Sequence, residues 1–286
     1  MTILGAVFRP ETPPERLREV VRVADDSGLE ELWLWEDCFL EGGVSAAALA
    51  LAWSERVRIG VGVFPVPLRN VALTAMEVAT LERLFPGRGI WGVGHGVQDW
   101  MGQVGARVAS PITLLREYLD ALRGLLAGER LTVKGRYIQL DDVALDWPPA
   151  AAPAILAAAT GPKTLRLVGE SADGLVLTAS TTSDGVRTAL DLARPEPSAD
   201  PFPVVVYLLT ATGPDAADRL AAELRAEHGD AAPDVGVAGD ARTIAAAVTR
   251  YAEAGATHVI LQPTTTEPDP VGFVRFVAEQ ARPLVR

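Results

Sequence analysis

The chain has 286 residues, a formal net charge of -11 and a sequence pI of about 4.8. This acidity argues against a nucleic-acid or anionic-membrane surface, because both need basic patches. One cysteine excludes an internal disulfide, and no apolar run is long enough to span a bilayer. Since no basic segment followed by an apolar run opens the chain, we expect a cytoplasmic protein without a signal peptide.

Short apolar stretches alternate with amphipathic helices from one end of the chain to the other. The predicted strands are residues 3–8, 32–35, 58–63, 90–94, 154–158, 174–178, 204–209 and 258–262. Helices are predicted to end at Gly28, to run from Asn70 to about residue 84, to begin at Ser110-Pro111 and at Gly161-Pro162, and to cover about 270–283. This order of elements predicts eight strand–helix units.

Runs such as V-V-V-Y-L-L at 204–209 are nearly continuous in apolar residues, which is typical of strands buried on both faces. We therefore predict a TIM (β/α)8 barrel, one domain over residues 1–286, with a doubly wound open sheet as the alternative. Residues 95–150 and 194–240 are longer than simple connections and predict insertions after the fourth and seventh strands. Within them, 131–149 predicts a hairpin and 194–203, rich in proline and acids, a surface loop.

A barrel of this type carries its active site at the carboxyl ends of the strands, so the residues that follow each strand are the candidates. The second strand runs into Glu36-Asp37-Cys38, and the third into F-P-V-P-L-R-N, which begins at Phe64. The fourth runs into Gly94-His95-Gly96 and the fifth into Ala159-Thr160-Gly161-Pro162-Lys163. Polar, small and glycine residues thus gather at one rim.

The A-T-G-P-K stretch is the best candidate for a phosphate site. A glycine at a strand-to-helix junction lets backbone N–H groups approach an anion, and a helix N-terminus favours negative charge. The alternative is an ordinary turn with proline at the first helical position. The run G-V-G-H-G at 92–96 fits backbone contact with a flat ligand, but it lacks the spacing of a P-loop.

The histidines argue against a metal centre. Of the three, only His95 follows a predicted strand at the catalytic rim, whereas His228 lies near the end of a predicted helix and His258 begins the eighth strand. Metal-dependent barrel hydrolases need several such ligands at the rim, so we expect no His-rich metal centre. The acids at the rim could hold a hard cation, but nothing in their spacing demands one, and we predict no metal. Cys38 has no adjacent basic residue to lower its pKa, which favours a packed small side chain over a nucleophile.

Taken together, these stretches resemble the luciferase-like monooxygenase superfamily, and within it the oxidoreductases that use the deazaflavin coenzyme F420. The stretches that carry the resemblance occur in the family's order over nearly the whole chain. They are G-L-E-E-L-W-L-W-E-D-C-F, R-I-G-V-G-V-F-P-V-P-L-R-N, W-G-V-G-H-G-V-Q-D-W-M-G-Q-V-G, A-A-A-T-G-P-K-T-L-R-L-V-G and S-A-D-G-L-V-L.

The resemblance implies a barrel that binds its flavin or deazaflavin at the carboxyl-end mouth, and a homo-oligomer, specifically a dimer. It also implies a cis peptide bond between Gly62 and Val63, in a bulge of the third strand behind the ring. The loops after strands four to six are expected to meet the phosphate side of the cofactor. The cofactor-binding residues implied are Gly62, Val63, Phe64, Gly94, His95, Gly96, Ala159, Thr160, Gly161 and Pro162.

Many F420 enzymes of this family carry Asp-His after the second strand, and here the matching pair is Glu36-Asp37. By resemblance Glu36 takes the place of the acid and Asp37 that of the histidine. A carboxylate there could move a proton if burial raised its pKa toward neutrality. The alternative is that Glu36 caps a loop by accepting backbone N–H bonds, and His95 is the next catalytic candidate.

The resemblance implies hydride transfer between F420 and a small organic substrate. One alternative is a monooxygenase that uses reduced FMN and oxygen, and another is a non-catalytic flavin-binding barrel. Several apolar side chains near the strand ends are expected to line the mouth around the substrate. These are Trp35, Phe39, Phe64, Trp91, Trp100 and Met101.

Overall fold

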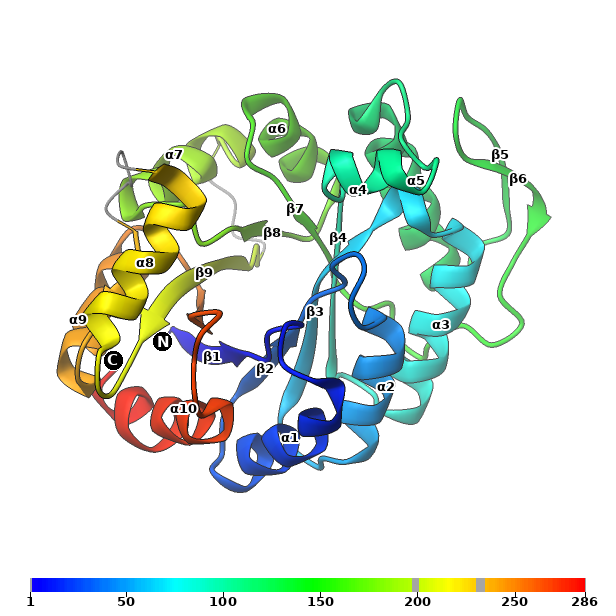
Figure 1. Ribbon diagram of the computed structural model, residues 1–286. Helices are drawn as coiled ribbons and strands as arrows, with labels where there is room; N and C mark the ends of the chain where they lie inside the picture. Colours follow the sequence, from blue (N-terminus) through cyan, green and yellow to red (C-terminus); the bar gives the residue numbers. More distant parts are fainter. Residues whose placement is uncertain (1, 197–200, 230–234, 286) are drawn as a thin grey trace.

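The computed structural model describes residues 2–196, 201–229 and 235–285 and shows a closed ring of parallel strands surrounded by helices (Figure 1). The strands of the ring are β1 (Ile3–Val7), β2 (Glu31–Leu34), β3 (Arg58–Pro65), β4 (Gly89–Gly94), β7 (Ile155–Ala158), β8 (Gly174–Leu177), β9 (Val204–Ala211) and β11 (His258–Pro263). They pair in the order β11-β1-β2-β3-β4-β7-β8-β9, and β9 pairs again with β11. This closure confirms the predicted (β/α)8 barrel and rules out the open sheet.

Helices follow the strands and form the outer layer (Figure 1). They are α1 (Leu17–Asp26), α2 (Gly43–Ala52), α3 (Val71–Leu84), α5 (Pro111–Leu126), α6 (Pro162–Ser171), α7 (Ser183–Ala193), α9 (Ala241–Glu253) and α10 (Pro270–Phe276), which continues into a π-helical turn over Val277–Ala281. The predicted helix start at Asn70 is confirmed, because its Oδ1 accepts hydrogen bonds from the backbone N–H of Ala72 at 2.9 Å and of Leu73 at 3.4 Å.

Extra elements lie in both predicted insertions. After β4 the chain adds α4 (Gln98–Gln103), and after α5 it adds the hairpin β5 (Leu131–Lys134) and β6 (Gln139–Val143). After β9 it adds α8 (Ala216–His228) and the short strand β10 (Val237–Ala238). The predicted loop at 194–203 and the insertion at 194–240 fall partly on residues 197–200 and 230–234, which lie outside the described residues.

The barrel interior pairs large side chains on some strands with glycines on others. A Cβ added at Gly60 would lie 2.5 Å from the Trp33 ring, and one added at Gly62 would lie 2.0 Å from the Tyr207 hydroxyl. Trp33 and Tyr207 reach from β2 and β9 into space that the β3 glycines leave free, which fills the barrel as a packed core. In the described chain, no helix is long and apolar enough to cross a membrane.

Candidate active site

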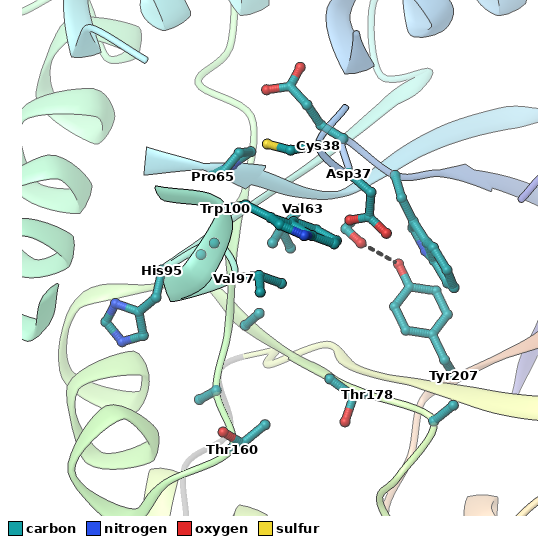
Figure 2. A pocket seen from close by; sticks show the side chains of 18 of the residues that line it. Asp37, Cys38, Val63, Pro65, His95, Val97, Trp100, Thr160, Thr178 and Tyr207 are labelled. Atoms are coloured by element: carbon teal, nitrogen blue, oxygen red, sulfur yellow. Dashed lines mark hydrogen bonds between the residues drawn. The ribbon is translucent and has the colours of Figure 1, made fainter. Parts of the chain in front are cut away.

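A cavity of about 410 Å³ opens at the carboxyl ends of the barrel strands, a volume within the range of roughly 300–1,000 Å³ that small-molecule sites occupy. Figure 2 shows the side chains that surround it. Its lining residues are Trp35, Glu36, Asp37, Cys38, Gly62, Val63, Pro65, Gly94, His95, Gly96, Val97, Trp100, Met101, Ala158, Ala159, Thr160, Thr178, Ala179, Tyr207 and Gln262. The cavity lies where the barrel predicts an active site.

Val63 forms part of the cavity wall because the register of β3 shifts against β4 between Val61 and Phe64. Such a bulge re-aims a side chain at the rim of a sheet. The Gly62–Val63 peptide bond is cis, which confirms the prediction, and the Tyr207 hydroxyl donates a hydrogen bond to the Gly62 carbonyl oxygen at 3.1 Å (Figure 2). A second cis bond, Cys38–Phe39, was not predicted.

The glycines of β4 make room for this bulge. A Cβ added at Gly92 would lie 2.8 Å from a Val63 methyl group, and one added at Gly94 would lie 2.7 Å from the other. Distances this short would force Val63 out of its position. The W-G-V-G run therefore shapes the cavity through packing against Val63, in addition to any contact with a flat ligand of the kind that the sequence pattern indicated.

Asp37 brings a carboxyl group to the cavity without a partner of its own. Its side chain reaches toward Tyr207 (Figure 2), and within the described chain no hydrogen bond reaches its carboxylate. Burial raises the pKa of Asp37 to about 6, the nearby Glu11 carboxylate adds to the rise, and Arg9 opposes it. An acid whose pKa lies near neutrality can both give and accept a proton.

Glu36 also lines the cavity, but its carboxylate is held by other protein groups. Oε1 and Oε2 accept hydrogen bonds from Arg69 Nη1 at 3.0 and 3.1 Å, and Oε2 accepts one from the backbone N–H of Gly43, at the start of α2, at 2.7 Å. Arg69 also pairs with Glu77 on α3. This geometry is the loop-capping arrangement that the sequence left open for Glu36, and it ties β2 to α2 and α3.

The His95 imidazole lies on the α6 side of the cavity. Nε2 is 3.2 Å from the Thr164 hydroxyl oxygen, and the ring is turned away from Asp37 (Figure 2). Burial lowers the pKa of His95, so the neutral form is favoured. A neutral ring joined to the first turn of α6 fixes the loop after β4 against the loop after β7.

The turn after β7 leaves open space where the sequence predicted a phosphate site. Ala159 and Thr160 line the cavity, whereas Gly161 and Pro162 lie just beyond it, at the start of α6. Apart from its two chain neighbours, no described residue has an atom within 4 Å of a Cβ added at Gly161, whose φ of -96° any residue adopts. The N-terminus of α6 carries no side-chain cap, so its first backbone N–H groups are free to meet an anion.

The aromatic and other apolar residues predicted at the mouth divide into two groups. Trp35, Trp100 and Met101 line the cavity. Phe64 and Trp91 are fully buried outside the cavity lining, where their rings stack with centroids 6.2 Å apart. Phe39 is 64% exposed and also lies outside the lining. The mouth is therefore poorer in aromatic residues than the sequence suggested.

Several residues that face the cavity from the last strands were not predicted from the sequence. Tyr207 lies on β9, Thr178 follows β8 and Gln262 lies on β11. Arg9 follows the first strand at the same rim, but no role was predicted for it from the sequence: it is buried just after β1, over the Trp35 ring, and pairs with Glu223 of α8 at 2.6 Å. Tyr207, Thr178 and Gln262 are single polar residues on or directly after buried apolar strands, so no local motif marks them. Only the alternation of side chains along a strand could have indicated that they face the cavity.

The remaining histidines do not line the cavity. His228, at the end of α8, is 3.5 Å from the Ser180 hydroxyl oxygen. His258 opens β11 at the other end of the barrel, 3.5 Å from the buried Glu31, and burial lowers its pKa to about 4. Across residues 2–196, 201–229 and 235–285, no three His, Cys, Asp or Glu side chains are placed to hold a metal ion.

Two curated relatives share about a third of their aligned residues with this chain. One is a 5,10-methylenetetrahydromethanopterin reductase of Methanolobus tindarius, 31% identical over 181 residues, which are 63% of this chain and 55% of the relative. The other is an F420-dependent glucose-6-phosphate dehydrogenase of Kineococcus radiotolerans, 31% identical over 186 residues, 60% of this chain and 54% of the relative. The chain thus matches little more than half the length of these relatives.

A solved structure supports the fold. An F420-dependent secondary alcohol dehydrogenase in complex with an F420-acetone adduct aligns with a TM-score of 0.87 over 100% of this chain and 99% of that one, at 21% identity. Residues 4–255 also match the family described as luciferase-like monooxygenase, which is most of the chain. The barrel, its cavity and this match agree: the chain belongs to the luciferase-like monooxygenase family.

Proposed function

We propose that this protein is an oxidoreductase that transfers a hydride between coenzyme F420 and an organic substrate in the cavity at the carboxyl ends of its strands. The observation that carries the proposal is the Asp37 carboxyl group, which faces an apolar-walled cavity and has no hydrogen-bond partner in the described chain. Burial raises the pKa of this group to about 6. Two F420-dependent enzymes among the similar proteins support the choice of cofactor.

The cavity suits a flat ring with a phosphate-bearing tail. Val63 and Ala158 offer apolar surface for the ring, and the open turn at Thr160 and Gly161 would hold the phosphate at the N-terminus of α6. F420 accepts or donates a hydride at C5 of its deazaflavin ring. The protein's task is to orient the substrate against that carbon and to keep water out.

Asp37 would hold the proton that accompanies the hydride. Its ionised carboxylate can accept a proton from a substrate hydroxyl group, and its protonated form can return one. Since the pKa of Asp37 is about 6, substrate oxidation should become faster as the pH rises through about 6, and substrate reduction should become slower. Glu36 would act by positioning, because Arg69 and Gly43 hold its carboxylate.

Parallel titrations of the purified protein with F420 and with FMN test the cofactor assignment. We expect saturable F420 binding at micromolar concentration and much weaker FMN binding. Tight FMN binding without F420 binding would instead support a flavin monooxygenase. A panel of secondary alcohols, followed by loss of the absorbance of oxidised F420, tests turnover, and F420 binding without turnover of any compound would favour a non-catalytic binding barrel.

The dimer implied by the resemblance is also a proposal, and the outer helices support it. Leu49 of α2 and Leu73 and Met76 of α3 are 47%, 49% and 57% exposed, on helices that lie next to each other (Figure 1). Exposed apolar side chains on neighbouring helices are typical of an interface. Light scattering after size exclusion should give twice the chain mass, and Leu73→Glu should shift it to the monomer.

A further inference from the structure

Gln262 places an unpaired carboxamide in the cavity. The residue lies on β11, is only 5% exposed and lines the cavity. Within the described chain, no hydrogen bond reaches its side chain, and its amide atoms are open to the cavity. A carboxamide offers two N–H donors and one carbonyl acceptor. These groups are therefore available to form hydrogen bonds with a molecule in the cavity.

The strand order places Gln262 across the barrel from the proposed cofactor contacts. β11 is separated from β4 by three strands in either direction around the ring: β1, β2 and β3 on one side, and β9, β8 and β7 on the other. Gln262 lies two residues after Ile260, which belongs to the barrel interior, so both side chains point inward. The residues proposed to hold the cofactor lie on β3, on β4 and after β7, which leaves the β11 side for the substrate.

The charges of the cavity restrict what can lie beside Gln262. Of the residues described, those that line the cavity include no lysine or arginine, but they include Glu36 and Asp37. The Arg9 guanidinium, which lies over the Trp35 ring, is already paired with Glu11 and Glu223. An anionic group placed here would lose its water shell without gaining a cation, which is costly.

We infer that the β11 side of the cavity binds an uncharged substrate that carries a hydroxyl or carbonyl group, with the Gln262 carboxamide as its hydrogen-bonding partner. This inference rests on the proposed function, because it places the cofactor on the β3–β4–β7 side. Gln262 donates to the substrate oxygen or accepts from its hydroxyl group, and Asp37 lines the same cavity. Sugar phosphates and hydroxy acids do not fit.

The side-chain amide signals of Gln262 test the inference without reference to turnover. In a 15N–1H spectrum, the pair of signals absent from Gln262→Leu belongs to this residue. The F420-loaded protein is titrated with 2-propanol, cyclohexanol, benzyl alcohol and their carbonyl counterparts, and separately with lactate, mandelate and glucose 6-phosphate. We expect at least one uncharged compound to shift these signals in a saturable way and none of the charged ones to do so.

Variants measure how much the Gln262 side chain contributes to substrate affinity. Gln262→Leu keeps the volume but removes the donors and the acceptor, so affinity for the uncharged compound should fall roughly three- to tenfold, the worth of one net hydrogen bond. F420 affinity should stay within about twofold if the residue belongs to the substrate side. Gln280→Leu, the same change at an exposed residue of the C-terminal segment, is the matched control and should alter neither affinity.

The outcomes separate this inference from the proposed function. Shifts caused only by the charged compounds, or no shift with any uncharged one, would overturn the inference while F420 binding left the function standing. Shifts on F420 addition alone, with a large loss of F420 affinity in Gln262→Leu, would assign the residue to the cofactor and also overturn it. Failure of F420 to bind, with shifts by an alcohol, would remove the function and retain the uncharged-ligand site.

Discussion

The two sides of the barrel mouth are built from different kinds of residue. On the β3–β4–β7 side the wall consists of small or apolar residues such as Val63, Gly94 and Ala158, and the start of α6 lies beside it. On the β9–β11 side Tyr207 and Gln262 reach into the cavity. The first side offers apolar surface and space. The second offers the unpaired Gln262 carboxamide, while the Tyr207 hydroxyl already donates to the Gly62 carbonyl oxygen.

This difference suggests that one side binds the cofactor and the other selects the substrate. A cofactor with a flat ring and a phosphate binds most tightly where the ring meets apolar surface and the phosphate meets backbone N–H groups, and the first side supplies both. Discrimination between substrates gains most from buried polar groups, because a substrate that leaves them unpaired is rejected strongly. We expect changes on the first side to alter cofactor affinity and changes on the second to alter turnover and substrate choice.

The largest effect should come from Asp37→Asn. An amide cannot accept the substrate proton, and loss of such a group typically lowers turnover by about 10²–10⁴. F420 affinity should be nearly unchanged, since the residue is placed beside the substrate. The measurements are kcat with F420 and the F420 dissociation constant, with the exposed Asp184→Asn as control. A loss of only a few-fold would assign Asp37 a structural role and make His95 the next candidate.

Gly62→Ala should destabilise the fold, because its Cβ would lie 2.0 Å from the Tyr207 hydroxyl and 2.9 Å from the Trp33 ring. Overpacking of this kind costs about 1–3 kcal/mol in the free energy of unfolding, which thermal or urea unfolding measures. The control is the same change in open space, Gly161→Ala, which should leave stability unchanged or slightly raised. Equal stability of the two variants would show that the barrel interior can accommodate an additional methyl group beside β3.

A second change in the same place sharpens this test. Tyr207→Phe removes the hydroxyl group that a Cβ at position 62 would meet first. The double variant should therefore recover part of the stability lost in Gly62→Ala. Strictly additive losses would show that the close approach of β3 and β9 does not determine the cost.

Gly161→Val should weaken F420 binding by roughly tenfold while leaving the melting temperature nearly unchanged. The added side chain would occupy space that the protein leaves empty and that the cofactor phosphate is proposed to use. Isothermal titration and thermal unfolding of the same preparation measure both quantities. Equal loss of affinity and stability would instead support an ordinary turn between β7 and α6.

The smallest effect concerns stability and pH. The folded state raises the pKa of Asp37 to about 6, above its ordinary value, so the folded protein binds the proton more tightly than the unfolded chain. Its contribution to stability is present at low pH and is lost as the pH rises through about 6. Asp37→Asn should therefore melt at a higher temperature than the wild type at pH 8, with the difference shrinking toward pH 4.

The barrel could be predicted because its evidence is local and repeated. Every strand of the ring was placed within two residues, since apolar runs bounded by turn residues mark buried strands directly. Among the boundaries that differ from the prediction, the start of β2 has a clear physical reason. The strand begins at Glu31, an acid that no strand pattern favours. Glu31 is fully buried because Trp33 Nε1 donates to it at 2.9 Å and Arg58 pairs with it at 3.1 Å, partners that only the fold brings together.

The candidate site could be predicted only where residues form a contiguous motif. Glu36 and Asp37 were found together at the end of β2, but their different roles depend on Arg69, which is distant in sequence and binds only Glu36 of the two. Gln262 was not found, because a single glutamine in an apolar strand has no signature. Its significance comes from the ring closure that places β11 opposite β4.

The structure of the F420 complex tests the division between the two sides most directly. We predict the deazaflavin ring against Val63, its phosphate at the Thr160–Gly161 turn, and Asp37 and Gln262 facing the ring across open space. A ring that lies against Tyr207 and hydrogen-bonds Gln262, with its phosphate away from the start of α6, would contradict the account.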